Sequence, residues 1–222
     1  MNSQLKNTFK IMIVDDHPIF CLGMAELINK ESDLVVSDIE DTADKAWSAI
    51  KKNKPDLVIV DISLKESNGL DLVEDIKREY PGLPVLVLSM YDEALYAERA
   101  LISGARGYIM KQKAIGQVVK AIHQLLSGEI YASQQIKNKM FNRLISHSTT
   151  GEKVGLEILT NRELEVFRLI GDGLDSREIA VRLNLSIKTI GTHCENIKKK
   201  LNLKHYTELV KFAVHWSQKI KR

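Results

Sequence analysis

Residues 10–16 read KIMIVDD, a short apolar run that ends abruptly in two aspartates. Two later runs end in a similar way: LVIVD at 57–61 closes on Asp61, and VLVLS at 85–89 closes on Ser89. Apolar runs of this length without polar alternation are typical of strands covered on both faces of a parallel sheet. The runs therefore predict a sheet with polar side chains at the carboxyl ends of its strands.

Two more runs, Leu34–Val36 and Tyr108–Met110, complete a set of five. Segments with the 3.6-residue apolar period of helices separate and follow them, as at 70–80 and at 115–126. Five strand–helix repeats within about 120 residues imply a doubly wound α/β domain. We expect it to span residues 8–127, with a five-stranded parallel, flavodoxin-like sheet.

The remainder of the chain has a different pattern. Residues 128–155 are rich in Ser, Thr, Lys and Gln, and we interpret them as a linker that includes one short amphipathic helix. Residues 156–222 show no strand pattern and form an all-α domain. Capping residues predict three helices there, which begin near Thr160, Asp175 and Ser186, and the spacing of apolar residues predicts a fourth from about Tyr206. About three residues separate the middle pair, the spacing of a helix-turn-helix.

The composition excludes several classes of protein. With 44% hydrophobic and 27% charged residues, the chain is not a disordered one. No apolar run approaches the roughly 18 residues of a membrane span, and the first ten residues lack the apolar core of a signal peptide. Two isolated cysteines, Cys21 and Cys194, form no disulfide framework. We therefore expect a cytoplasmic protein without a membrane partner.

The net charge of +3 conceals an uneven distribution. Residues 156–222 hold 13 basic and 8 acidic side chains, a local charge of +5, which leaves −2 for the rest of the chain. A basic domain of this kind is typical of proteins that bind the phosphate backbone of nucleic acids.

The polar residues beyond the strands are expected to meet in one pocket, because ligands of open parallel sheets bind past the carboxyl ends of the strands. Three carboxylates placed together repel one another and need a cation, and an all-oxygen ligand set favours Mg²⁺. A cation-screened Asp61 is a candidate nucleophile toward a phosphoryl group, whose oxygens a lysine and a hydroxyl would contact. The predicted pocket contains Asp15, Asp16, Asp61, Ser89 and Lys111.

This pocket resembles that of two-component receiver domains, on the motifs Asp15-Asp16, Asp61, Asn68-Gly69, Ser89 and Lys111. The resemblance implies that Asp61 is the phosphoacceptor and that Lys111 pairs with the phosphate. It implies that Ser89 and Tyr108 form a pair whose coupled rotation reports phosphorylation. The implied Mg²⁺ ligands are Asp15, Asp16, Asp61 and the backbone carbonyl of Ser63.

The sequence departs from the receiver pattern at two positions. Lys65 stands where the family usually has Pro, which affects the shape of the loop after Asp61. Gln112 follows Lys111 where many members have Pro. Because cis bonds before non-proline residues are costly, Gln112 argues against a cis bond at this position.

The helical domain resembles the LuxR-type helix-turn-helix, on the segments LTNRE at 159–163, SREIA at 176–180 and SIKTI at 186–190, with His193. In such motifs the second helix enters the major groove. Its core side is expected to consist of Ile187, Ile190, Ile197 and Leu201. The resemblance implies contacts to bases from Gly191, Thr192 and Glu195, and to the backbone from Lys188, Thr189 and Lys199. The full candidate set for DNA is Ser186, Lys188, Thr189, Gly191, Thr192, His193, Glu195, Asn196 and Lys199.

Receiver and helix-turn-helix together resemble the NarL/FixJ class of response regulators over nearly the whole chain. The resemblance implies that a sensor histidine kinase phosphorylates Asp61, and that phosphorylation controls sequence-specific binding to double-stranded DNA and transcription. Apart from Mg²⁺-dependent autophosphorylation and autodephosphorylation at Asp61, no enzyme activity is expected. We expect the inactive receiver to cover the recognition helix, and a homodimer to form on phosphorylation or on DNA. The implied dimer contacts are Tyr206, Leu209, Val210 and Ala213.

Two other functions are compatible with parts of the sequence. A haloacid-dehalogenase-like phosphatase also uses Asp, Mg²⁺, Ser or Thr and Lys, but it carries D-x-D directly after its first strand, where this chain has Asp15-Asp16. Alternatively, the helical domain docks a protein rather than DNA. A steep fall of affinity with salt is expected for DNA and would separate these possibilities.

Overall fold

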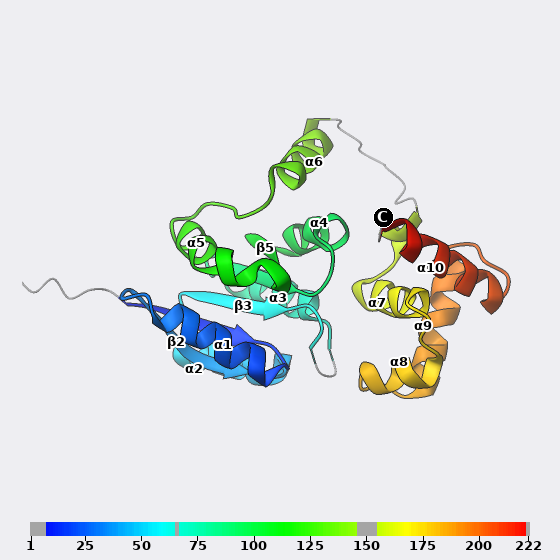
Figure 1. Ribbon diagram of the computed structural model, residues 1–222, viewed down its shortest axis with the longest axis horizontal. Coiled ribbons are helices and arrows are strands. Elements are labelled where there is room, and N and C mark those ends of the chain that lie inside the picture. The colour runs from blue at the N-terminus through cyan, green and yellow to red at the C-terminus, as the bar shows by residue number, and fades with distance from the viewer. Residues whose placement is uncertain (1–7, 65–66, 146–154, 221–222) are drawn as a thin grey trace, which may run out of the picture. The chain divides into compact units, whose positions relative to one another are not determined.

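The structure is a computed structural model, and it describes residues 8–64, 67–145 and 155–220. The described residues form two compact units, one ending with helix α6 and the other beginning with the short helix η2 (Figure 1). None of the described helices has the length and apolar character that crossing a membrane requires.

The first unit contains a five-stranded sheet in which all neighbours are parallel and the strand order is β2-β1-β3-β4-β5. This confirms the predicted fold. Both β3 and β4 are buried along their whole length, whereas β2, at the edge of the sheet, alternates between exposed and half-buried residues after the buried Leu34. The strands are β1 (Phe9–Val14), β2 (Leu34–Glu40), β3 (Leu57–Asp61), β4 (Val85–Ser89) and β5 (Gly107–Met110).

Helices cover both faces of this sheet (Figure 1). Helices α1 (Pro18–Asn29) and α5 (Ala114–Leu126) pack on one face and share a core with β1, β3, β4 and β5. The other helices are α2 (Ala43–Asn53), α3 (Gly69–Glu79) and α4 (Glu93–Ser103), with a short helix η1 (Lys111–Lys113) before α5. This doubly wound arrangement leaves the carboxyl ends of the strands accessible for a site.

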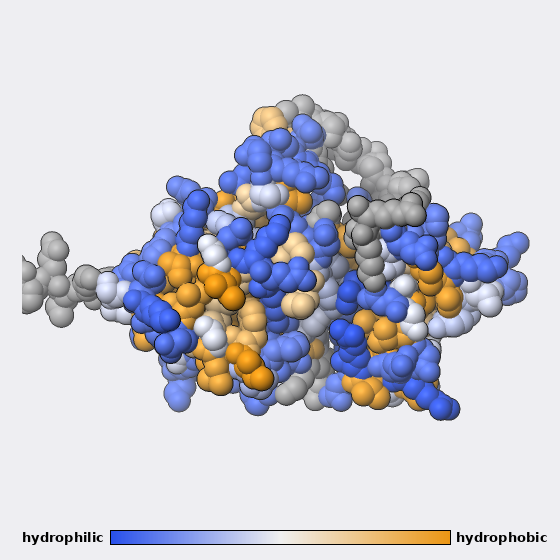
Figure 2. All heavy atoms as spheres, in the orientation of Figure 1, coloured by the Kyte–Doolittle hydropathy of each residue, from blue (hydrophilic) through white to orange (hydrophobic). Residues whose placement is uncertain are grey.

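The first turn of α5 does not follow its predicted apolar pattern. Val118 and Ile122 are fully buried, but Ile115 is 80% exposed, because this turn begins at the carboxyl edge of the sheet, beyond the strands. Ile19 and Leu22 of α1 are exposed as well. Apolar side chains accordingly gather on the surface over α1 and α5 (Figure 2).

Much of the segment interpreted as a linker packs onto the first unit. Tyr131 extends the sheet by a parallel bridge to Gly107, where its carbonyl accepts from the amide of Tyr108 at 3.1 Å. Helix α6 (Gln134–Ile145) follows and packs against α4, where Lys139 forms an ion pair with the largely buried Glu98. Residues 146–154, the rest of the predicted linker, lie outside the described residues.

The second unit is helical, as predicted. Capping boxes at Thr160 and Asp175 open α7 and α8, and the Ser186 hydroxyl accepts the amide of Thr189 to open α9. Helices α8 and α9 form the helix-turn-helix. The elements are η2 (Gly155–Ile158), α7 (Asn161–Gly171), α8 (Ser176–Arg182), α9 (Ile187–Lys200) and α10 (Tyr206–Ile220).

Three predicted positions in this unit are wrong. Ile187 was expected to face the core but is 53% exposed, because it is the first residue of α9 and only part of that turn is covered. Leu209 and Ala213 were expected to contact a second copy, but both are fully buried in their own chain. Helix α10 packs on α7 so closely that a Cβ on Gly171 would lie 2.6 Å from the Ala213 carbonyl oxygen.

Candidate functional site

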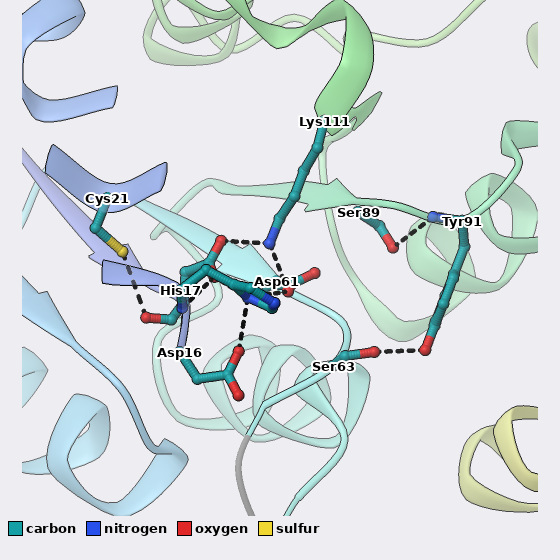
Figure 3. A network of polar contacts seen from close by, with 9 residues as sticks. Asp16, His17, Cys21, Asp61, Ser63, Ser89, Tyr91 and Lys111 are labelled. Atoms are coloured by element: carbon teal, nitrogen blue, oxygen red, sulfur yellow. Dashed lines mark hydrogen bonds and ion pairs between the residues drawn. The ribbon is translucent and has the colours of Figure 1, made fainter. Parts of the chain in front are cut away.

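The predicted acidic pocket forms at the carboxyl ends of the strands (Figure 3). Asp15 follows β1, Asp61 ends β3, and both are almost fully buried. Lys111, directly after β5, reaches between them, with its Nζ 2.6 Å from Asp15 Oδ2 and 2.7 Å from Asp61 Oδ2. Its ammonium also lies 4.6 Å from the centre of the Phe20 ring. Lys111 thus links the first strand to the third.

His17 is a member of the pocket that we did not predict. Its Nδ1 lies 2.8 Å from Asp16 Oδ1, 3.0 Å from Asp15 Oδ1 and 4.0 Å from Asp61 Oδ2. Its amide donates to Asp15 Oδ1, which ties the loop after β1 to the carboxylate. The available signal was its place directly after the two aspartates, ahead of Pro18, which starts α1.

Burial changes the proton affinity of the pocket. It raises the pKa of Asp61 to about 6, with Lys111 opposing this shift and the Asp15 carboxylate adding to it. Burial alone would lower the pKa of Lys111, but Asp61 and Asp15 outweigh it, so that the pKa is raised and the ammonium stays charged. Opposite charges that share a buried site stabilise each other's ionised forms. A further cation would favour the ionised carboxylate of Asp61 in the same way.

The donor set fits a hard divalent cation. Ligand atoms of Asp15, Asp16, His17 and Asp61 all lie within 4.8 Å of one another. Asp16 Oδ1 is buried and accepts no hydrogen bond within the described part of the chain, although the His17 ring is near it. Carboxylate oxygens in such a cluster are the ligands that Mg²⁺ prefers.

The loop after Asp61 depends on the Asn68-Gly69 motif. Asn68 caps α3 by accepting the amide of Leu70, and it bridges back to Ser63. Gly69 is needed because a Cβ there would lie 1.8 Å from the carbonyl oxygen of Asp61. This bridge holds Ser63 beside the capping residue of α3. Lys65 lies outside the described residues.

The predicted hydroxyl and aromatic residues lie on the two strands that follow β3 in the sheet. Strand pairing sets Leu88 beside Asp61 and Met110 beside Ser89, so that Ser89 ends β4 next to the pocket. The Tyr108 hydroxyl is buried and donates to the carbonyl of Tyr91 at 2.7 Å. Burial raises the pKa of Tyr108, which keeps this hydroxyl protonated as a donor.

The peptide bond after Lys111 is trans, since the described residues contain no cis bond. Gln112 is the middle residue of the short helix η1. Cys21 lies beside the pocket and donates to the backbone oxygen of Asp15. Burial raises the pKa of the Cys21 thiol to about 11, so that it remains a thiol rather than a thiolate.

In the second unit, α9 presents one exposed polar face. Five of its exposed residues lie on one side of the helix, because they recur with helical spacing: Lys188, Gly191, Thr192, Glu195 and Lys199. Ile187 and Lys200, at the two ends of α9, are exposed as well. Ser186 is exposed at the beginning of α9, and Thr189 and Asn196 are half-buried. This surface is suitable for entering a DNA groove.

The basic residues of α9 differ in their availability. Lys198 pairs with Glu195 at 2.8 Å, and Lys200 pairs with Glu163 of α7 at 2.6 Å. His193 is half-buried, and burial together with the Arg162 charge lowers its pKa. Lys188 and Lys199 are exposed at opposite ends of the polar face, where phosphates would lie.

Sequence comparison identifies two families in this chain. The family described as response regulator receiver domain matches residues 11–123, and the family described as bacterial regulatory proteins, luxR family, matches residues 157–213. The oxygen regulatory protein NreC of Staphylococcus epidermidis is 32% identical over 210 residues, covering 92% of this chain and 96% of that protein. NreC of Staphylococcus carnosus is also 32% identical, with the same coverage.

Solved structures give a similar result. RcsB from Salmonella enterica serovar Typhimurium, bound to promoter rprA in the presence of the phosphomimetic BeF₃⁻, aligns with a TM-score of 0.59 and 26% identity. The alignment covers 94% of this chain and 99% of that structure. A two-component response regulator of the LuxR family from Aurantimonas aligns over 62% of this chain and 99% of its own, with a TM-score of 0.57 and 28% identity.

Proposed function

The chain belongs to the LuxR family of response regulators, and on this premise we propose that a sensor histidine kinase phosphorylates it at Asp61 and thereby controls its binding to DNA. The observation that carries the proposal is the pocket in which Lys111 bridges two buried carboxylates. A buried lysine held there by charge is suited to pair with a phosphoryl group that arrives at Asp61.

In the proposed reaction, a carboxylate oxygen of Asp61 attacks the phosphorus of a phosphohistidine. The new O–P bond replaces the P–N bond, whose electron pair stays on the departing ring nitrogen. Because the other ring nitrogen carries a proton, the histidine leaves as neutral imidazole. Lys111 exchanges its contact with Asp61 for one with a phosphoryl oxygen, and the Ser89 hydroxyl donates to another. The Asp61 carboxylate would also accept a phosphoryl group from a small acyl phosphate, and the phosphorylated residue would lose it to water. All of the proposed chemistry therefore takes place at Asp61.

Asp15, Asp16, Asp61 and the backbone carbonyl of Ser63 would hold Mg²⁺. When bound, Mg²⁺ supplies positive charge against the phosphoryl oxygens and the clustered carboxylates. Of these four residues, Asp15 and Asp61 also contact Lys111. The negative charge of these two carboxylates would therefore be balanced by the Lys111 ammonium and by Mg²⁺.

We assign residues 8–127 to the receiver, 156–222 to the DNA-binding domain and 128–155 to the connection. The exposed face of α9 would enter the major groove of double-stranded DNA, with Lys188 and Lys199 on phosphates. RcsB, which aligns with more than nine-tenths of this chain, was solved on promoter DNA with a phosphomimetic and as dimers on DNA, and this supports the proposal. The corresponding dimer surface here would use Tyr206, which is exposed, and Val210, which is half-buried.

Phosphate labelling of the full-length protein tests the proposal. Incubation with acetyl phosphate and Mg²⁺ should add one phosphoryl group that hydroxylamine removes, as expected of an acyl phosphate. Asp61→Asn should abolish the label, while Asp44→Asn, an acid at the start of α2, should retain it. Labelling that persists in Asp61→Asn would contradict the assignment. Continuous release of phosphate from phosphate esters would instead indicate a phosphatase.

A further inference from the structure

Tyr91 lies in the turn between β4 and α4, two residues after Ser89, and is 7% exposed. The sequence does not mark it, because one tyrosine in a turn has no distinctive pattern. It contacts three residues that the proposed function places in or beside the phosphorylation pocket: Ser63, Ser89 and Tyr108. Figure 3 shows the contacts to Ser63 and Ser89.

Three different groups of Tyr91 make these contacts. Its amide donates to Ser89 Oγ at 3.1 Å, and its carbonyl accepts from the Tyr108 hydroxyl at 2.7 Å. Its own hydroxyl is hydrogen bonded to Ser63 Oγ. One residue therefore joins the loop after Asp61, the hydroxyl that ends β4 and the aromatic residue of β5.

The contact to Ser89 has a directional consequence. A serine hydroxyl has one donor and two acceptor positions. Because the Tyr91 amide fills one acceptor position, it restricts where the Ser89 O–H can point. A change in the position of the Tyr91 backbone would therefore reorient the Ser89 hydroxyl. It would at the same time move the Tyr91 carbonyl that accepts the hydrogen bond from Tyr108.

The ring of Tyr91 is held in place as well. It packs on Tyr96, which is fully buried in α4, with ring centres 4.6 Å apart. A displacement of Ser63 is therefore transmitted through a constrained ring to the Tyr91 backbone rather than absorbed by free rotation of the side chain.

We propose that Tyr91 is a positioning residue that couples the loop carrying Ser63 to the Ser89–Tyr108 pair, through the hydrogen bond between the Tyr91 and Ser63 hydroxyls. The inference depends on the proposed function, since it concerns the response to a phosphoryl group at Asp61. Ser63 contributes its backbone carbonyl to the proposed Mg²⁺ site, so that occupation of the pocket and the state of Tyr108 would be linked by this bond.

The test uses the full-length protein with its six tyrosines replaced by 3-fluorotyrosine, and beryllofluoride with Mg²⁺ as the phosphoryl mimic. The Tyr108 ¹⁹F resonance is assigned with Tyr108→Phe. Tyr91→Phe keeps the ring and both backbone contacts and removes only the hydroxyl. One net hydrogen bond is worth about 1 kcal/mol, or about fivefold in an equilibrium constant. In the complex saturated with beryllofluoride, we expect Tyr91→Phe to change the equilibrium constant between the two states of Tyr108 about fivefold.

Two further variants define this result. Ser63→Ala removes the other partner of the same bond, and it should give the same change, with no additional change in the double variant. Tyr80→Phe, a tyrosine that packs on Trp47 away from the pocket, should respond like the wild type. A merely structural role would lower stability without changing the response of Tyr108 at saturation.

A Tyr108 response in Tyr91→Phe equal to that of the wild type would overturn the inference, as would additive effects in the double variant. Failure of the proposed function has a different signature: the wild type itself would show no Tyr108 response, or Asp61→Ala would show the same response as the wild type.

Discussion

Gly69 shows how a single residue shapes the loop after Asp61. Its missing side chain lets the backbone pass directly over the carbonyl of Asp61, where a Cβ would lie 1.8 Å from the oxygen. Gly69→Ala should therefore displace that loop, lower the free energy of unfolding by about 1–3 kcal/mol and slow labelling by acetyl phosphate. Denaturant unfolding and the labelling rate measure the two effects.

Gly116 provides the matched control. It is exposed within α5 and a Cβ there would meet no atom within 4 Å, so that Gly116→Ala should stabilise the protein by about 0.5–1 kcal/mol. If Gly69→Ala behaved like Gly116→Ala, the close approach at Asp61 would not determine the loop.

Glu163 carries a pH-dependent contribution to the stability of the second unit. Burial alone would raise its pKa, but Lys200 and the amide of Thr160 outweigh burial, so that the pKa lies below its usual 4.5. A carboxylate with a depressed pKa stabilises the folded state above its unfolded pKa and loses this contribution as pH falls through the folded value. The free energy of unfolding of the wild type should exceed that of Glu163→Gln by about 1 kcal/mol at pH 7. This difference should shrink below about pH 4.5.

Unfolding of the second unit can be followed by the fluorescence of Trp216, because its ring packs on Phe167 there. Both proteins carry Trp47→Phe, which removes the only other tryptophan of the chain. Glu157→Gln, an exposed acid before α7, serves as the control. A difference between wild type and Glu163→Gln that stays constant from pH 7 to pH 3 would show that the charge of Glu163 is not involved.

At the scale of the element, α9 has one face committed to its own domain and one face available to DNA. Lys198 and Lys200 are paired with acids, whereas Lys188 is exposed beside the capped start of the helix. Lys188→Ala should weaken DNA binding for all sequences alike and reduce the slope of log affinity against log salt by about one. Titrations of labelled DNA at several salt concentrations measure both quantities.

The control for this variant is Lys211→Ala, which removes an exposed lysine of α10. It should leave the slope unchanged. A slope for Lys188→Ala equal to that of the wild type, or a change confined to one DNA sequence, would exclude a phosphate contact by Lys188.

Elements also show what periodicity predicts and what it leaves open. The carboxyl ends of parallel strands meet at one edge, so that Asp15, Asp61 and Lys111 could be brought together from sequence alone. Periodicity does not say where the covering layer stops, which is why Ile115 and Ile187, each in the first turn of its helix, are exposed.

Contacts between distant segments were harder to predict. The apolar face of α10 has the same sequence pattern whether it packs on a partner or on α7, and tertiary packing decides between the two. The sequence therefore assigned Leu209 and Ala213 to a contact with a second copy, whereas both are buried in their own chain. Tyr91 was missed for a related reason: its contacts come from residues 28 and 17 positions away, which no local motif records.

At the scale of the whole molecule, the chain joins two units with different tasks. The first holds a compact acidic pocket whose charge Lys111 balances, and the second is the basic part of the chain. That the receiver covers the recognition helix in the inactive state remains a prediction. Either way, phosphorylation can control DNA affinity only if the phosphorylated and unphosphorylated states differ in their free energy of binding DNA.

The most direct test of this central claim is the ratio of DNA dissociation constants of the full-length protein without and with beryllofluoride and Mg²⁺, at fixed salt. The DNA is first selected from random sequence by the protein itself. For the wild type the ratio should be about 5–150, the usual range of coupling between two sites, and for Asp61→Ala it should be close to one. Equal ratios for the two proteins would contradict the control of DNA binding by phosphorylation at Asp61.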